Sequence, residues 1–260
     1  MSSSPIALLS DFGLSDVYVG VMKGAIAQIA SDIRVIDLTH QIPPQNRLAA
    51  RFCLLNAYRY FPPGTIFVAV VDPGVGSDRQ GIAIQCDFGY LVGPDNGIFS
   101  GILAQSPAIS AVTLSNAAYW RTSEPSTTFH GRDIFAPVGA YLAAGVPLSQ
   151  IGNPLNPADL VELSLPPPQK GDREILGHIQ YIDYFGNCIT TIPRSWVQDR
   201  HWFVRVGDRE IPGSLTYSSV SPGELVALAG SHGWVEIAAN CGSARSQLAV
   251  DWLDAIALIY

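Results

Sequence analysis

The sequence is poor in charged residues, and those it has are not clustered. Only 14% of its 260 residues are charged, against about 25% in an average globular protein. This shortage indicates that part of the surface is apolar and covered by another subunit, so we expect an oligomer. The 15 Lys and Arg are scattered and the net charge is −7, which argues against a nucleic-acid partner. A hydrophobic content of 48% predicts a well-filled globular core.

Long hydrophobic runs and paired cysteines are also missing. No stretch approaches the roughly 18 apolar residues of a membrane span, and MSSSPIALLSDFG has no basic segment typical of a signal peptide. We therefore expect a soluble cytoplasmic protein. Cys53, Cys86, Cys188 and Cys241 lie far apart with no C-x-x-C pair. This spacing predicts buried free thiols and neither a zinc site nor a structural metal.

Several familiar catalytic motifs are absent as well. The glycines of PGVGS lack the G-x-G-x-x-G spacing of a dinucleotide-binding turn, and the chain contains no G-K-[ST] phosphate loop. It contains neither a G-x-S-x-G nucleophile elbow nor an H-E-x-x-H zinc helix. Any catalytic site must therefore be built from other residues.

The first part of the chain alternates strand-like and helix-like segments, which predicts an N-terminal α/β domain with a central, mostly parallel sheet over residues 1–164. Three consecutive prolines in LPPPQKGD predict a linker at 165–171. Short β-rich segments then predict a smaller C-terminal all-β barrel at 172–260, with a sandwich as the alternative. Expected strands are 6–10, 33–39, 65–71, 81–86 and 89–94, the last two forming a hairpin, and expected helices are 17–30, capped by Ser15 or Asp16, 47–61 and 133–144.

Polar groups gather where apolar runs end, in segments 10–16, 70–79, 93–97 and 129–133. In VVDPGVGSDR, Asp72 sits where a buried strand leaves the core, a usual place for a functional carboxylate in α/β proteins. An Arg beside a carboxylate keeps it ionised, and an ionised Asp with a neutral His can orient a water and take up its proton. Asp72, Arg79 and His130 are thus a candidate catalytic set. The alternative is an ordinary Asp-Pro-Gly turn, a solvated Arg and a structural His.

In the second domain, YIDYFGN (181–187) and SHGWVEIAANCGSA (231–244) place polar residues beside aromatic ones. This mixture suits a flat heteroaromatic ligand with amide and hydroxyl groups. The alternative is that Gly186 and Gly233 mark hairpin turns, with Asn187 and Ser231 making turn hydrogen bonds.

Together these segments resemble the S-adenosyl-L-methionine (SAM) hydrolase family, also called SAM hydroxide adenosyltransferases, which is related to the fluorinating and chlorinating SAM enzymes. The resemblance covers nearly the whole chain, in family order. The motifs are SDFG-x-x-D, IDLTH-x-I-P, YFPPGT-x-F-x-x-VVDPGVGS-x-R, GPDNG, FHGRD-x-FAP, ID-x-FGN and S-x-G-x-x-EIA-x-N-x-GSA.

The resemblance implies hydrolysis of SAM to adenosine and L-methionine by a water or hydroxide that attacks C5′, without a cofactor or metal. It also implies a homotrimer whose active sites lie between the N-terminal domain of one subunit and the C-terminal domain of its neighbour. Asp11 would hold the ribose hydroxyls, and Asp72, Arg79 and His130 would activate the water.

In the second domain the resemblance assigns further substrate contacts. Asp183 would bind the methionine amino group, Asn187 and Ser231 the adenosyl and methionyl portions, and Asn240 the adenine, while Glu236 would meet the adenine amino group only indirectly, in a supporting role. The fluorinating relatives have an Arg that binds the methionine carboxylate where this chain has His232. The resemblance therefore does not say which residue of this chain binds that carboxylate.

The halogenating relatives have a Tyr in place of Asp72 and another in place of His130. A carboxylate repels a halide but accepts a hydrogen bond from water, so hydrolysis is favoured over halide transfer. Two alternatives stay open: a SAM or adenosine sensor without turnover, and a SAM-dependent chloride transferase.

Overall fold

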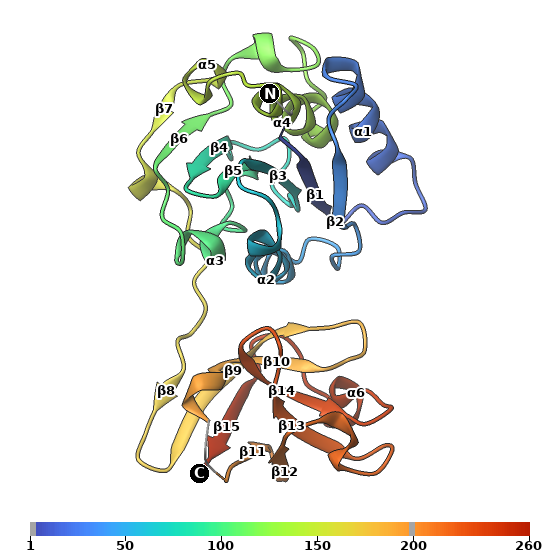
Figure 1. The fold of residues 1–260 in the computed structure, drawn as a ribbon, viewed down its shortest axis with the longest axis vertical. Helices are drawn as coiled ribbons and strands as arrows, with labels where there is room; N and C mark the ends of the chain where they lie inside the picture. Colours follow the sequence, from blue (N-terminus) through green and yellow to red (C-terminus); the bar gives the residue numbers. More distant parts are fainter. Residues whose placement is uncertain (1–3, 198–200) are drawn as a thin grey trace. The chain divides into compact units, whose positions relative to one another are not determined.

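A computed structural model describes residues 4–197 and 201–260 of the chain. Contacts between residues divide the chain into two compact units, Met1–Ser164 and Leu165–Tyr260 (Figure 1). Each unit is described by itself below.

The first unit is built on a seven-stranded sheet of order β2-β1-β3-β5-β4-β6-β7. Four neighbouring strands are parallel to one another, and β4 and β5 form the antiparallel hairpin expected from the sequence. Because β6 is antiparallel to β4, it runs in the same direction as β5. The prediction of a mostly parallel sheet is therefore confirmed. The strands are β1 Ile6–Ser10, β2 Val35–Thr39, β3 Thr65–Val70, β4 Gly81–Cys86, β5 Gly89–Pro94, β6 Ser110–Thr113 and β7 Pro154–Leu155.

Helices cover both faces of this sheet (Figure 1). Helices α1 (Tyr18–Ile29) and α4 (Ala136–Ala143) pack together on one face, and α2 (Arg47–Ala57) and α3 (Ser100–Leu103) pack together on the other. On the first face, apolar side chains of β1 and β3 pack against α1 and α4 in one buried cluster. The remaining short helices are η1 Tyr58–Tyr60, η2 Ala117–Tyr119, η3 Gly131–Phe135, α5 Leu148–Ile151 and η4 Pro157–Asp159.

Two helix starts differ from the expectation. Neither Ser15 nor Asp16 caps α1; its N-cap is Val17, whose backbone is already helical and whose side chain makes no capping bond. The helix expected from residue 133 begins instead with one π-helical turn, Gly131–Phe135, and continues as α4. Single π-turns are rare and occur often at functional sites.

The second unit is a β-barrel. Its strands have the order β10-β14-β13-β12-β11-β15-β9-β8, and an additional pairing of β10 with β9 closes seven of them into a ring. The prediction of a C-terminal barrel is therefore confirmed. The elements are β8 Gln169–Lys170, β9 Glu174–Ile182, β10 Cys188–Pro193, η5 Arg194–Trp196, β11 Phe203–Val206, β12 Arg209–Ser214, η6 Tyr217–Ser219, β13 Leu225–Ala229, β14 Trp234–Ala239, α6 Ala244–Leu248 and β15 Ala255–Ile259.

All four cysteines are free thiols. Cys86 and Cys188 are buried, and burial raises the pKa of each to about 12. Cys53 is partly buried and Cys241 is exposed in the turn after β14, so the expectation that every thiol is buried is wrong for these two residues. None of the helices in the described ranges is long and apolar enough to cross a membrane.

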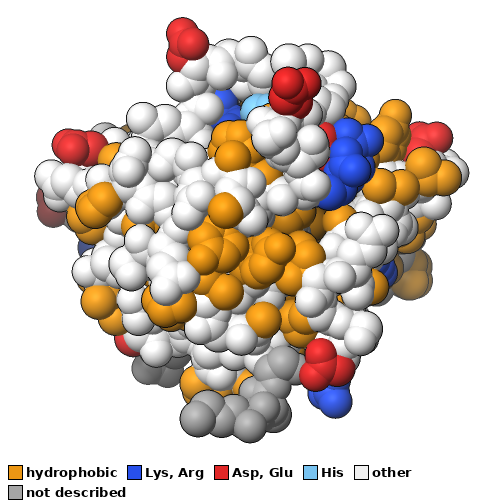
Figure 2. All heavy atoms as spheres, turned by 90° about the horizontal axis from the view of Figure 1, so that it is seen from above, with side chains coloured by type: hydrophobic (Ala, Val, Ile, Leu, Met, Phe, Trp, Pro, Cys, Tyr) orange, Lys and Arg blue, Asp and Glu red, His pale blue; other side chains and the backbone are white. Residues whose placement is uncertain are grey.

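Large hydrophobic side chains lie on the surface around the start of α1: Leu14, Val17, Tyr18 and Val21 are all exposed. Figure 2 shows one face of the molecule on which hydrophobic side chains gather in the middle and acidic and basic side chains lie mostly toward the edge. Exposed apolar patches of this kind mark interaction sites in soluble proteins.

Candidate active site

The carboxyl ends of four parallel strands bring four polar residues to one edge of the first sheet. His40 follows β2, Asp11 follows β1, Asp72 lies two residues beyond β3, and Asn96 lies two residues beyond β5. In the register of the sheet Ser10 lies opposite Val70, so the chain leaves β1 and β3 side by side. Ligands of open α/β sheets bind at this edge.

A pocket of about 300 Å³ opens at the same edge of the sheet. Asp11 and Asp72 bring two carboxylates to it, and His130 brings an imidazole from the residue before the π-turn. The lining residues are Asp11, Phe12, Pro44, Gln45, Val70, Asp72, Pro73, Val75, Thr128, Phe129, His130 and Gly131. No group of three or more His, Cys, Asp or Glu in the described part of the chain is arranged to hold a metal ion.

Asp72, Arg79 and His130 form one hydrogen-bonded group. Arg79 Nε lies 2.9 and 3.0 Å from the two carboxylate oxygens of Asp72, and Arg79 Nη2 also donates to Oδ2. The same Nη2 lies 2.8 Å from His130 Nδ1. The side chains of Asp72 and Arg79 are only 6% and 11% exposed, so Arg79 is not a solvated loop charge.

The contact with Arg79 indicates which ring nitrogen of His130 carries the proton. A guanidinium can only donate, so Nδ1 must accept, and the ring is neutral with its proton on Nε2. Burial lowers the pKa of His130, and the charge of Arg79 lowers it further, which favours the same neutral form. His130 thus offers an N–H donor at Nε2 and no free acceptor, whereas the carboxylate of Asp72 can accept a proton.

Two close contacts fix the loop that carries Asp72. Asn96, which is 9% exposed, donates through Nδ2 to the carbonyl of Val71 at 2.9 Å. Gly76 has φ +78°, and a Cβ there would lie 2.6 Å from the carbonyl oxygen of Thr127. The turn chemistry of PGVGS therefore lets the Asp72 loop approach the segment that leads to His130.

That segment is held by a buried carboxylate. Asp133 is fully buried and accepts bonds from Arg121, Arg132 and the backbone N–H of Ser126. Burial alone would raise its pKa, but these donors outweigh it and hold the pKa well below the usual range. The Arg132 guanidinium in turn lies 5.1 Å above the ring of Phe129.

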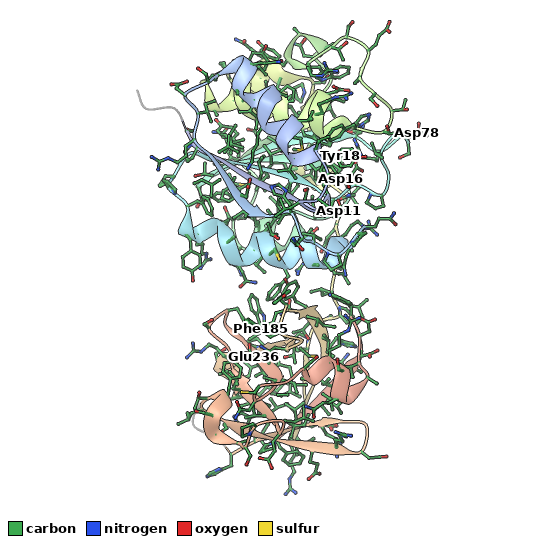
Figure 3. The ribbon with its side chains drawn as sticks, turned by 90° about the vertical axis from the view of Figure 1, so that its right-hand side faces the viewer. Asp11, Asp16, Tyr18, Asp78, Phe185 and Glu236 are labelled. Atoms are coloured by element: carbon green, nitrogen blue, oxygen red, sulfur yellow. The ribbon has the colours of Figure 1, made fainter. Side chains whose placement is uncertain are left out.

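Two aromatic rings, Phe12 and Phe129, line the pocket, and Tyr18 contacts both. The rings of Phe12, Tyr18 and Phe129 make mutual edge and tilted contacts with centroids 5.3–5.9 Å apart. Figure 3 shows Asp11 and Tyr18 on the same side of the first unit. Asp11 Oδ2 accepts a hydrogen bond of 2.7 Å from the backbone N–H of Gln45, which leaves Oδ1 for a ligand.

In the second unit, Asp183 organises the turn between β9 and β10. Its Oδ1 accepts from the backbone N–H groups of Phe185 and Asn187, each at 2.9 Å, and its Oδ2 accepts from Asn187 Nδ2 at 3.0 Å. The turn leaves the ring of Phe185 71% exposed. Asp183 and Asn187 are therefore brought together, and the turn interpretation holds for Gly186.

Glu236 is 3% exposed and both of its oxygens have partners. Tyr217 Oη donates to Oε1 at 2.5 Å, and His232 Nε2 lies 2.7 Å from Oε2. Burial raises the pKa of Tyr217, and the bond to Glu236 raises it further. Because His232 Nδ1 accepts from the backbone N–H of Trp234 at 3.2 Å, the ring has no spare N–H for a carboxylate.

The other two predicted residues lie near turns of the barrel. Asn240 Nδ2 donates to the carbonyl of Val220 at 2.7 Å, and Ser231 is exposed in the turn between β13 and β14. Figure 3 places Phe185 and Glu236 at the same end of the second unit. The ligand roles of these residues stay predictions.

Comparison with known protein families agrees with this geometry. Residues 6–152 match the SAM hydroxide adenosyltransferase N-terminal domain, and residues 177–257 match the C-terminal domain of the same family. The chain belongs to the SAM hydroxide adenosyltransferase family. The resemblance drawn from the sequence motifs is thus confirmed.

Proteins of several organisms are similar to the chain over nearly its whole length. An (R)-S-adenosyl-L-methionine hydrolase of Thermus thermophilus is 40% identical over 250 residues, 94% of this chain and 95% of the relative. A fluorinase of Actinopolyspora mzabensis is 26% identical over 92% of this chain and 91% of its own. A crystal structure of an uncharacterised Thermotoga maritima protein matches with TM-score 0.91 and 35% identity, covering 98% of this chain and 100% of that one.

The structure also shows site residues that sequence reasoning passed over. Ser10, Asp37, His40, Asn96 and Asp133 lie within the family motifs, but no role was predicted for them. The available signal was position for three of them, since Ser10 ends the buried strand β1, Asn96 lies two residues beyond β5 and His40 directly follows β2.

Proposed function

We propose that the protein hydrolyses SAM to adenosine and L-methionine. The observation that carries the proposal is the Asp72, Arg79 and His130 group at the pocket, in a chain that belongs to the SAM hydroxide adenosyltransferase family. Asp11 and Asp72 contribute two negative charges and Arg79 one positive charge, so these three residues together with a neutral His130 carry a net charge of −1. This complements the sulfonium of SAM.

In the proposed reaction the C5′–O bond forms as the C5′–S bond breaks. The electron pair of the C5′–S bond returns to sulfur, so methionine leaves as a neutral thioether and no acid is needed. The water must lie in line with the C5′–S bond, and orientation of this kind contributes at most about 7–11 kcal/mol. His130 Nε2–H donates to the water oxygen, and Asp72 accepts the proton that the water loses.

Asp11 holds the ribose hydroxyls in this proposal. Residues of the second unit supply the other contacts: Asp183 to the methionine amino group, Asn187 and Ser231 to the adenosyl and methionyl portions, and Asn240 to the adenine. Since Glu236 is only 3% exposed and binds Tyr217 and His232, its role is to hold these two residues in place.

We further propose that the protein is a homotrimer. The low fraction of charged residues and the exposed apolar side chains around the start of α1 support an interface between copies. Size-exclusion chromatography with light scattering at several protein concentrations measures the assembly. A monomeric mass at micromolar concentration would contradict this part of the proposal.

The test of the reaction is chromatography of protein incubated with the separate (R) and (S) sulfonium diastereomers of SAM, with and without chloride. We expect equimolar adenosine and methionine, independent of chloride, and faster formation from the (R) form on which the relatives are named to act. Tight binding without product would favour a sensor. Formation of 5′-chloro-5′-deoxyadenosine would favour chloride transfer.

A further inference from the structure

A chain of polar contacts runs from the surface of α1 to the end of β1, where Ser10 directly precedes Asp11 of the pocket. Lys23 Nζ donates to Asp37 Oδ2 at 2.7 Å, Asp37 Oδ1 lies 3.1 Å from His40 Nε2, and His40 Nδ1 lies 2.7 Å from Ser10 Oγ. Ser, His and Asp in this order resemble a nucleophilic triad. However, Ser10 is fully buried and His40 is 2% exposed, so the hydroxyl is closed to a substrate. This chain of contacts therefore has a structural role.

Each hydrogen bond in this chain of contacts can be given a donor and an acceptor. Burial alone would raise the pKa of Asp37, but the bonds from Lys23 and His40 outweigh it and lower the pKa, so Asp37 is an ionised anchor. Its oxygens only accept, which places a proton on His40 Nε2, although the angle of this contact is poor for a regular hydrogen bond. With the ring proton on Nε2, Nδ1 accepts from the hydroxyl of Ser10.

His40 also joins the two loops that follow β1 and β2. Its backbone carbonyl accepts from the N–H of Gly13 at 2.8 Å, and Ser10 Oγ accepts from the N–H of Phe12 at 3.3 Å. The second loop continues to Gln45, whose N–H binds the carboxylate of Asp11. Gln45 has φ +64°, in the left-handed region that is unfavourable for a residue with a side chain. The surrounding loops hold this residue at the pocket.

We infer that His40 is a positioning residue for substrate binding: through Ser10 and the paired loops it fixes where the carboxylate of Asp11 meets the ribose. The inference rests on the proposed role of Asp11. A binding group must be held within about 0.5 Å of its productive position by locked neighbours, and His40 is the buried side chain that links both loops.

Two substitutions distinguish the roles of the two ring nitrogens of His40. His40→Asn places an amide where Nδ1 was and keeps the partner of Ser10, whereas His40→Gln places its amide where Nε2 was and loses Ser10. Adenosine affinity is measured by calorimetry, kcat and KM with SAM by product formation, and stability by thermal unfolding. His178→Asn, in β9 of the second unit, is the control, because it replaces another largely enclosed histidine, whose Nδ1 has no hydrogen-bond partner.

We expect His40→Gln to bind adenosine about tenfold more weakly, equivalent to about 1.4 kcal/mol, and to raise KM more than it lowers kcat. His40→Asn should stay within about threefold of the wild type. His178→Asn should change neither affinity nor KM. A purely structural role would lower the melting temperature of both His40 variants without this difference in affinity.

The inference is overturned if folded His40→Gln and Ser10→Ala proteins bind adenosine and SAM as the wild type does. If His40→Gln fails to fold, Ser10→Ala decides, because it keeps the ring and removes only the hydroxyl. If the wild type binds adenosine but forms no product from SAM, the proposed function fails and the affinities still test His40. If the wild type does not bind adenosine, the inference falls with the role of Asp11.

Discussion

Replacing Asp72 with asparagine keeps the size of the side chain and removes its negative charge. In the structure the carboxylate accepts bonds from Arg79 on both oxygens and is 6% exposed. An amide keeps one acceptor oxygen and turns an N–H₂ toward the donors of Arg79. We expect the variant to fold, with Arg79 less firmly held, and to lose the group that accepts the proton of water.

The size of both effects follows from these contacts. Loss of a positioned general base lowers kcat by about 10²–10⁴, which corresponds to roughly 3–5 kcal/mol in the activation free energy. One poorly matched partner of Arg79 costs on the order of 1–3 kcal/mol in the free energy of unfolding. Affinity for adenosine should change little, because adenosine lacks the sulfonium that the charge of Asp72 attracts.

The assay is adenosine formation at saturating SAM, together with thermal unfolding and adenosine binding. Asp78→Asn is the matched control, since Asp78 lies on the same loop with its side chain exposed, and Figure 3 shows it at the outer edge of the first unit. We expect this control to match the wild type in all three measurements.

The reasoning would be refuted by a folded Asp72→Asn protein whose kcat lies within about threefold of the wild type, a loss far below that of a general base. A fall in kcat in which Asp78→Asn shares equally would also refute it, because the effect would then come from the charge of the loop. Loss of adenosine binding would show that Asp72 holds the pocket together.

Three further predictions follow from other contacts. The neutral His130 is the form that accepts from Arg79, and burial and the charge of Arg79 lower the pKa of this ring, so kcat should stay constant as the pH falls through 6.5 and decline only below the lowered pKa. Between pH 6.5 and the lowered pKa the unfolded chain binds a proton that the folded chain does not, so the free energy of unfolding should decrease as the pH decreases. An acid limb above pH 6.5 would contradict this. Gly76→Ala should lower both stability and kcat, because its Cβ meets a carbonyl oxygen. Gly145→Ala, with φ +93° and open space around it, should lower stability alone. Equal kcat values for the two variants would contradict a role of the Gly76 contact in catalysis. Tyr217→Phe leaves one oxygen of the buried Glu236 without its donor and should destabilise the protein by about 1–3 kcal/mol in urea unfolding, and an unchanged unfolding curve would show that water replaces the hydroxyl.

Local patterns were sufficient for much of the fold. The strand 6–10 and the hairpin of 81–86 with 89–94 were predicted with correct bounds, because a buried strand bounded by turn residues has few other solutions. The helix expected from residue 133 was less accurate. Its π-turn contains Asp133, which binds Arg121 and Ser126 through contacts that do not follow from helical spacing.

The sequence by itself determined the two fold classes, the family and the residue types of the candidate site, because apolar periodicity and ordered motifs are local properties of the chain. Only the tertiary structure decided that Arg79 is shared between Asp72 and His130, which sets the tautomer of the ring. It alone brought His40 into contact with Ser10, the neighbour of Asp11, and gave both oxygens of Glu236 a partner. The direction of a hydrogen bond depends on which side chains meet across the sheet and the barrel, and spacing along the chain does not contain that information.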